Sequence, residues 1–340
     1  HNRFDDLRCV MEEIKNENKV KKFLSLAGRY VRGHVSDVAA YAGLVLCLIV
    51  FTITSDGRLW SSYNISVLLE SVCVYMIVAL GALFVYAMGY MDISVGTQIG
   101  VYCLLMIFII NATGSLLLGF LVVLALTLVC GAFNGMVAVW LKLPSIVTSL
   151  FLMFLFGGIQ MLMVESTGSS TVSTKYDFSA FLEPGVILVS ILIIAVIVFY
   201  LFNFTKLGRY TRGIGANELT TGQCGVNTTK WKVIAYMVFG VCVAIGSVFL
   251  LARTGSAGKG TGSSYAMDVM LSLILGGMPL SGGMKSKVRC ALVGSFTYAL
   301  LSNGLTLSNV DTSLVYLVKA IIFFIVVALS CRDKSGVLPR

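Results

Sequence analysis

The stretch 205–232, TKLGRYTRGIGANELTTGQCGVNTTKWK, separates two strongly apolar runs and is the longest polar segment between such runs in this chain of 340 residues. It contains five basic residues and one acid, Glu218, and glycines interrupt it at positions 208, 213, 215, 222 and 225. Short loops rich in Lys and Arg remain on the cytoplasmic side of a membrane. The stretch therefore predicts a cytoplasmic loop between two membrane spans, in which a short helix can form.

The composition of the whole chain supports a membrane protein. Hydrophobic residues make up 57% and charged residues 12% of the chain, and the mean hydropathy is +0.91. Soluble domains average about 45–50% apolar and about 25% charged residues. We therefore predict an all-α integral membrane protein with about ten transmembrane helices, some of them discontinuous. The predicted spans are 37–54, 65–88, 93–110, 116–140, 145–164, 186–204, 233–252, 268–280, 290–307 and 313–330.

The segment 268–280 is the shortest of these spans. As a helix it covers about 20 Å, whereas the hydrocarbon core of a bilayer measures about 30 Å. Gly276 and Gly277 interrupt its end, and Pro279 follows. We expect a broken helix that still crosses, because discontinuous helices in transporters line cavities where water or protein satisfies the freed backbone groups.

The distribution of basic residues predicts the orientation. With the N-terminus inside, twenty of the 25 Lys and Arg fall on the cytoplasmic side, Lys319 falls within a span, and Arg58, Lys175, Arg253 and Lys259 lie outside. Both termini are then cytoplasmic: 1–36 is a basic N-terminal segment, 37–330 is one polytopic domain, and 331–340 is a tail. The net charge of +9 reflects this orientation and does not indicate a nucleic-acid partner.

The sequence offers no catalytic or metal-binding constellation. The nine cysteines are scattered singly, and the histidines are His1 and His34. The string RTGSAGKG resembles a phosphate-binding loop, but that loop needs Gly first and Ser or Thr after the Lys. Arg253 and Gly260 hold those positions. We expect no catalytic residues, no metal and no cofactor in this chain, and any ATP would be used by another polypeptide.

Polar residues at membrane depth are the candidates for a substrate pathway, because such residues face the interior of a bundle. Asp92 and Asp268 begin predicted helices, so helix capping is the alternative explanation for them. Glu70 and Lys319 can reach the interface by snorkelling, and an interior structural role is the alternative for Lys319. Gly96-x-x-x-Gly100 and Gly131-x-x-x-Gly135 favour close helix packing. The predicted pathway residues are Asp92, Ser94, Asn134, Thr148 and Ser272.

Several short motifs resemble one family. The pattern G-R-Y-x-x-x-x-G-x-N-E at 208–218, followed by CGVN at 224–227, resembles the cytoplasmic coupling loop of permease subunits in bacterial ABC importers. The resemblance is to the monosaccharide, ribose-type branch of the branched-chain amino acid and sugar permease family. Further elements in the same order are MDISVG (91–96), FNG (133–135), LPSIVT (143–148), GSSYAMD (262–268), LGGMPLSGG (275–283), NGL (303–305) and Lys319.

The resemblance implies a set of partners. ABC ATPase subunits, which bind ATP and Mg²⁺, would dock on the coupling loop, and an extracytoplasmic binding protein would deliver the sugar. A second permease would complete the pathway, as a homodimer or as a heterodimer with a sister chain. The assembly would sit among lipids of the cytoplasmic (inner) membrane of a bacterium. The implied coupling-loop residues are Arg209, Gly213, Gly215, Asn217, Glu218 and Gly225.

The substrate is the least determined part of this prediction. The family's T-L-G-T-M element is replaced by TSLFL at 148–152, its Glu by Ala266 and an Arg by Phe156. Losing polar groups beside a pathway changes what that pathway can hydrogen-bond. The alternatives are a permease for branched-chain amino acids or nucleosides, an ion-coupled secondary transporter, and a signalling receptor or membrane scaffold.

Overall fold

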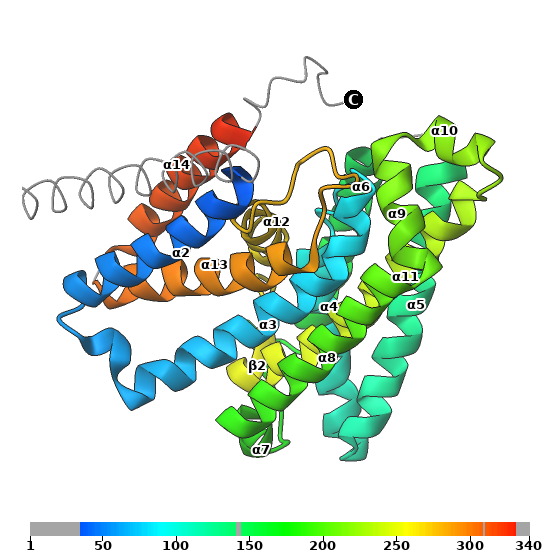
Figure 1. The fold of residues 1–340 in the computed structure, drawn as a ribbon. Coiled ribbons are helices and arrows are strands. Elements are labelled where there is room, and N and C mark those ends of the chain that lie inside the picture. The colour runs from blue at the N-terminus through cyan, green and yellow to red at the C-terminus, as the bar shows by residue number, and fades with distance from the viewer. Residues whose placement is uncertain (1–34, 141–143, 309, 331–340) are drawn as a thin grey trace, which may run out of the picture.

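The computed structural model describes residues 35–140, 144–308 and 310–330. In these residues each predicted span coincides with a helix (Figure 1). The ten helices are α2 (Val35–Thr54), α3 (Ser62–Ala87), α4 (Val95–Thr113), α5 (Leu116–Trp140), α6 (Ser145–Glu165), α8 (Pro184–Phe204), α11 (Thr228–Thr254), α12 (Tyr265–Leu275), α13 (Val288–Leu307) and α14 (Thr312–Ser330). The shorter elements are η1 (Arg58–Trp60), α7 (Ser179–Leu182), α9 (Lys206–Ala216), α10 (Glu218–Gln223), β1 (Thr171–Ser173) and β2 (Ser256–Gly258).

The described helices confirm the predicted all-α membrane fold. Seven of them, α3 to α6, α8, α11 and α13, are long and apolar enough to cross a membrane, and Ala40–Thr54 and α12 are shorter apolar helices. Most of the predicted N-terminal segment 1–36 and all of the tail 331–340 lie outside the described residues. The cytoplasmic placement of the two termini therefore stays a prediction.

Helix α3 forms the centre of the bundle. It is apolar on all sides, and 83% of its most hydrophobic window is buried against α8, α11, α12 and α13. Helix α8 is even more apolar, yet only 17% of its window is buried. A helix that is hydrophobic all round is surrounded either by protein or by lipid. Helix α3 is surrounded by protein, and α8 is expected to face lipid.

Glycines allow α5 and α11 to approach closely. A Cβ atom at Gly131 would lie 2.7 Å from the carbonyl oxygen of Tyr236, and one at Gly135 would lie 2.8 Å from Cα of Val233. No side chain fits at either distance, so the backbones of the two helices touch directly. The packing role predicted for this pair of glycines is confirmed.

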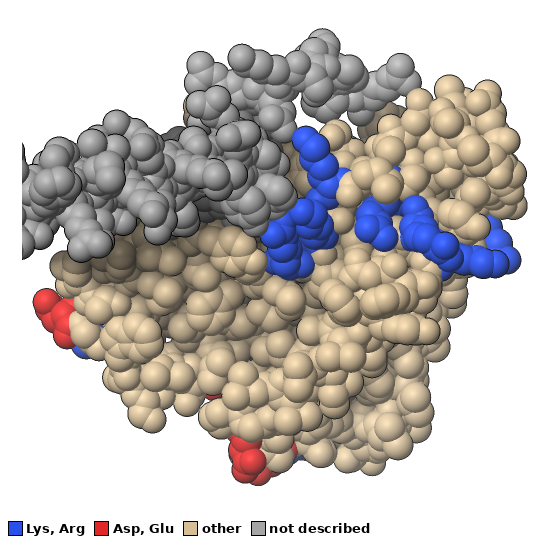
Figure 2. Space-filling view, viewed as in Figure 1, with Lys and Arg blue, Asp and Glu red and all other residues tan. Residues whose placement is uncertain are grey.

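The two ends of the bundle differ in structure. At one end β1 and β2 pair as antiparallel strands, with Val172 opposite Ala257; the sequence did not predict this sheet. At the other end lie α9 and α10, together called the α9–α10 element (206–223). Figure 2 shows Lys and Arg gathered in one band over the region of α9 and the segment between α12 and α13. The acids visible on this face lie beside α7 and beside the turn between α2 and α3.

The predicted broken helix is shorter than expected. Helix α12 ends at Leu275, not at residue 280, and its eleven residues cover about 16 Å. Gly276 and Gly277 end it, and Gly277 adopts a φ of +85°, which side-chain-bearing residues rarely adopt. Irregular backbone before and after α12 completes the path from β2 to Gly282 and Gly283, which contact the end of α3. The segment therefore connects the two ends of the bundle, as a broken helix.

Candidate functional site: the α9–α10 element and a buried polar cluster

The predicted coupling loop folds into the two helices of the α9–α10 element. The hydroxyl of Thr205 accepts a hydrogen bond from the backbone N–H of Leu207 at 3.2 Å and caps α9. Asn217 breaks the chain between the helices and caps α10 by accepting from the N–H of Thr220 at 3.2 Å. Side-chain oxygens at these positions satisfy donors that a helix start leaves free. Two local capping signals thus decide where each short helix begins.

Gly215 allows the α9–α10 element to pack directly against the bundle. A Cβ atom at Gly215 would collide with the carbonyl oxygen of Ala87, the last residue of α3, and would lie 2.6 Å from the backbone nitrogen of Gly283. That nitrogen donates a hydrogen bond of 2.8 Å to the same Ala87 oxygen. Three segments therefore meet where only a glycine fits: the end of α9, the end of α3 and the irregular chain after α12.

Glu218 forms a second attachment, which we call the Glu218 cluster (Tyr90, Glu218 and Lys232). Its carboxylate accepts a hydrogen bond from the hydroxyl of Tyr90 at 3.1 Å and forms an ion pair with the ammonium of Lys232 at 2.5 Å. The ammonium also lies 5.0 Å from the centre of the Tyr90 ring. Burial raises the pKa of the Tyr90 phenol, so the hydroxyl keeps its proton and donates to Glu218. The cluster joins α10, α11 and the segment 88–94.

The six predicted coupling-loop residues divide by exposure. Gly213 and Gly215 are half-buried, Gly213 beside Thr221 of α10 and Gly215 against the end of α3. Gly225, in the turn after α10, has a φ of +81°, a value that favours glycine. The other predicted residues, Arg209, Asn217 and Glu218, are exposed. Gly225 and the strongly exposed Leu219 lie on the same outer surface. Glu218 is exposed and also binds Tyr90 and Lys232, whereas Arg209, Asn217 and Gly225 lie on the outer surface of the element.

Three of the five predicted pathway residues form one buried network, the Asp92 cluster. One oxygen of Asp92 accepts from the backbone N–H of Ser94 at 2.9 Å and from its hydroxyl at 2.5 Å. The other oxygen accepts from the side-chain amide of Asn134 on α5 at 2.8 Å. The network continues along α4 through Gln98 and Tyr102, by bonds of 2.6 Å and 3.0 Å. Asp92 therefore links two helices as well as holding the start of α4.

Thr148 and Ser272 lie elsewhere. The hydroxyl of Thr148 on α6 is buried, and among the described residues neither it nor the Asn134 amide oxygen has a hydrogen-bond partner. One turn earlier, Ser145 accepts from the backbone N–H of Met91 at 3.2 Å, which places the start of α6 beside the segment 88–94. Ser272 donates to the carbonyl of Val269 within α12. Ser272 is thus satisfied by its own helix and is not part of the Asp92 cluster.

Several residues of these clusters were not predicted from the sequence. Gln98 and Tyr102 follow Ser94 at intervals of four residues, a spacing that places all three on one face of α4. That polar spacing within an apolar helix was a usable signal. Tyr90 and Lys232 carry no such signal, because their partner Glu218 is more than ten residues away from each.

A second buried polar cluster surrounds Asp268. Its carboxylate accepts hydrogen bonds from the hydroxyl of Tyr298 on α13 and, at 3.5 Å, from that of Tyr75 on α3. The rings of Tyr75 and Tyr265 stack with centroids 5.1 Å apart. Asp268 lies in the first turn of α12, whose N-cap is Ser264, so it binds side chains from other helices instead of capping its own. It shares no residue with the Asp92 cluster.

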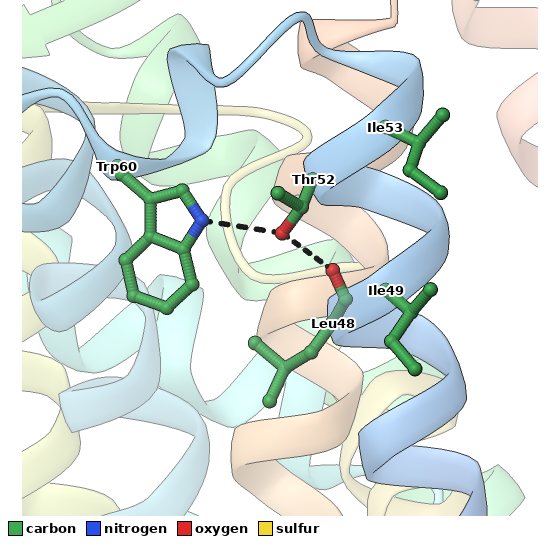
Figure 3. A pocket seen from close by; sticks show the side chains of 5 residues that line it. All are labelled: Leu48, Ile49, Thr52, Ile53 and Trp60. Atoms are coloured by element: carbon green, nitrogen blue, oxygen red, sulfur yellow. Dashed lines mark hydrogen bonds between the residues drawn. The ribbon is translucent and has the colours of Figure 1, made fainter.

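An apolar groove on α2 and η1 is separate from both clusters. It has a volume of about 300 Å³ and is lined by Leu48, Ile49, Thr52, Ile53 and Trp60 (Figure 3). The indole N–H of Trp60 donates to the hydroxyl of Thr52 at 3.2 Å, and that hydroxyl donates to the carbonyl of Leu48 at 2.7 Å. With its polar groups paired internally, the groove is an apolar surface suited to lipid and not to a hydrogen-bonding substrate.

Comparison with known proteins gives the family. Residues 64–327 match the family described as branched-chain amino acid transport system / permease component. The ribose import permease protein RbsC of Escherichia coli (strain K12) is 28% identical over 300 residues, covering 85% of this chain and 92% of that protein. The protein of the same name from Bacillus subtilis (strain 168) is 29% identical over 315 residues, covering 89% and 95%.

A relative named for a different substrate also matches. The autoinducer 2 import system permease protein LsrC of Photorhabdus laumondii is 29% identical over 268 residues, covering 77% of this chain and 80% of that protein. No solved structure matches the chain. The import permeases are bacterial, and the long apolar helices agree with the predicted multi-pass protein of the inner membrane. The chain belongs to the branched-chain amino acid transport system / permease component family.

Proposed function

We propose that this chain is the permease subunit of an ATP-driven importer that moves a monosaccharide, ribose or a related sugar, across the bacterial inner membrane. The relatives named as ribose and autoinducer 2 import permeases support the substrate class. A neutral polyol also needs hydrogen-bonding groups and no charged partner in its path. Buried serine, threonine and amide side chains supply such groups here.

The observation that supports ATP coupling best is the attachment of the α9–α10 element. It contacts the bundle closely at Gly215 and is bonded to it at Glu218, and it leaves Arg209 and Leu219 on its outer surface. A helix pair that is attached to the bundle and faces outward can transmit the movement of a docked partner to the membrane helices. In this proposal that partner is a separate ATPase, which binds ATP and Mg²⁺ and supplies the hydrolysis.

The Asp92 cluster is the proposed lining of the substrate path. Within the described residues, the Asn134 amide oxygen and the Thr148 hydroxyl are left without partners. Buried polar groups without partners are costly, and a sugar hydroxyl or a water molecule could satisfy them. Phe156, where the family has an Arg, packs edge-on against Tyr102 at 6.3 Å between ring centroids. This apolar contact favours a neutral substrate over a carboxylate, because it offers no cation.

A second permease and an extracytoplasmic binding protein complete the proposed assembly. Two ATPase domains need two docking elements, and this chain contributes one. The second permease is either another copy of this chain or a sister chain. The binding protein would deliver the sugar at the end that carries β1 and β2.

The test is uptake by proteoliposomes that contain the permease with its own ATPase and binding protein. We expect uptake of radiolabelled ribose that requires ATP and is unaffected by ionophores. Uptake of leucine or of a nucleoside in place of ribose would support the alternative substrates. Uptake that proceeds without ATP and stops when ionophores collapse the ion gradients would identify an ion-coupled carrier and overturn the proposal.

A further inference from the structure

We propose that Tyr90 is a positioning residue that transmits the state of the α9–α10 element to the Asp92 cluster through its hydrogen bond to Glu218. This inference rests on the proposed function. It concerns the segment 88–94, the short non-helical connection between α3 and α4. Tyr90 and Asp92 both belong to that segment and lie two residues apart.

The first step is the Glu218 cluster itself. The side chain of Lys232 is 7% exposed, whereas that of Glu218 is 44% exposed. A nearly buried ammonium is stable only when it is paired, so Lys232 holds Glu218 at the surface of the bundle. The carboxylate then has its second oxygen available for the Tyr90 hydroxyl. An exposed residue of α10 is thus tied by two bonds to two different parts of the bundle.

The second step is the confinement of the segment 88–94. Gly89 has a φ of +76°, and a Cβ atom there would lie 2.8 Å from the carbonyl oxygen of Ser281. On the other side, the backbone of Met91 is bonded to Ser145 of α6. Two residues of extended chain span about 7 Å at most. This short, confined connection therefore cannot absorb a displacement of Tyr90, and Asp92 would move with it.

The third step distinguishes this bond from the contact at Gly215. The Gly215 contact is purely steric, so it resists the approach of the α9–α10 element toward α3 but not its withdrawal. The ion pair from Lys232 resists withdrawal, because separation leaves its buried ammonium unpaired. The hydrogen bond from Tyr90, which lies at the surface of the bundle, ties the same carboxylate to the segment 88–94. An outward movement of the element would therefore pull on Tyr90. The Asp92 carboxylate, bonded to α4 and α5, would follow.

Tyr90→Phe tests the proposal, because it removes one hydroxyl and keeps the ring beside Lys232. Tyr210→Phe is the matched control: Tyr210 lies on α9, and its ring packs on Trp231 at 4.9 Å between centroids, a contact that phenylalanine preserves. The permease is reconstituted with its ATPase and binding protein, and ribose transported per ATP hydrolysed is measured. We expect this ratio to fall about tenfold in Tyr90→Phe, which corresponds to about 1.4 kcal/mol, with unchanged basal hydrolysis. Tyr210→Phe should match the wild type.

A background variant separates transmission from general destabilisation. In Glu218→Ala, the Tyr90 hydroxyl has lost its acceptor, so adding Tyr90→Phe should lower the ratio no further. A further loss in the double variant, or wild-type coupling in Tyr90→Phe, would overturn the proposal. If Tyr90→Phe does not accumulate in the membrane, Glu218→Met combined with Lys232→Met removes the same bond without leaving a buried charge, and wild-type coupling in that variant would overturn the proposal as well. Failure of the wild-type protein to transport ribose with ATP counts against the proposed function instead.

Discussion

The ammonium nitrogen of Lys319 on α14 lies 3.9 Å from a carboxylate oxygen of Asp268 on α12. The side chains are 14% and 9% exposed, so this ion pair lies inside the helix bundle. The same nitrogen lies 4.9 Å from the centre of the Tyr298 ring, whose hydroxyl binds Asp268. Of the two sequence hypotheses for Lys319, an interior structural role and snorkelling to the interface, the structure supports the interior role. The pair attaches the last helix to the broken helix.

Removing one member of this pair should destabilise the protein. Lys319→Met leaves the Asp268 carboxylate buried without its cation, which typically costs about 3–5 kcal/mol. The thermal unfolding midpoint of the purified permease in detergent should fall clearly. The control is Lys259→Met: Lys259 and Glu165 pair at a shorter distance, 2.7 Å, but are 43% and 53% exposed. Exposed pairs contribute about 0–1 kcal/mol, so equal shifts in the two variants would contradict this prediction.

Gly215→Ala should weaken coupling by forcing the α9–α10 element away from α3. The added methyl group would overlap the Ala87 carbonyl, and such overpacking costs roughly 1–3 kcal/mol. The matched control is Gly222→Ala, on α10, where the nearest atom to a new Cβ is 4.0 Å away. The measurement is substrate-stimulated ATP hydrolysis in the reconstituted complex. It should fall in Gly215→Ala and stay unchanged in Gly222→Ala; the same activity in both would show that the close contact has no role in coupling.

Cysteine accessibility tests the substrate path. In a background without native thiols, cysteines at Asn134 and Thr148 should react with water-soluble reagents in at least one transport state, because their polar groups have unpaired atoms among the described residues. A cysteine at Ser272 should react less, since that hydroxyl is bonded within its own helix. Ser295 on α13 is equally buried and bonded to its own helix, so it serves as an inert reference. Inertness at Asn134 and Thr148 would make them packing residues only.

The mass of the purified assembly tests the number of permease chains. A closed two-fold interface places the same surface patch of each copy in contact. Two copies of this chain per complex would support a homodimer, and a second permease polypeptide would support a heterodimer. A complex that transports with a single permease chain would rule out both. Native mass spectrometry of the complex with its ATPase distinguishes the three outcomes.

The spans could be predicted because each depends on local composition. An apolar run long enough to cross a bilayer forms a helix wherever it sits, since no other local structure satisfies its backbone in lipid. The boundary of α12 was less predictable: Gly276 and Gly277 marked the break, but their effect on the preceding turn depends on how tightly α13 packs. A Cβ atom at Gly294 of α13 would collide with the carbonyl of Ser272. Close packing of that kind is a tertiary property.

The polar sites were predictable only in part. Asp92, Ser94 and Asn134 were identified as unusual in apolar spans, and they do meet. The sequence could not say that Asn134 binds Asp92, because 42 residues separate them. The Glu218 cluster could not be predicted from the sequence for the same reason, since Tyr90 lies 128 residues from its partner Glu218.

The sequence by itself therefore determined the membrane fold, the approximate position of each span, the polar loop at 205–232 and the family. These follow from hydrophobicity, helix propensity and short motifs, which are properties of neighbouring residues. Only the tertiary structure decided which polar groups are paired, that Gly215 contacts the end of α3, and that Lys319 binds Asp268. Pairing energies depend on distance and burial, and both are set when helices far apart in the chain pack against one another.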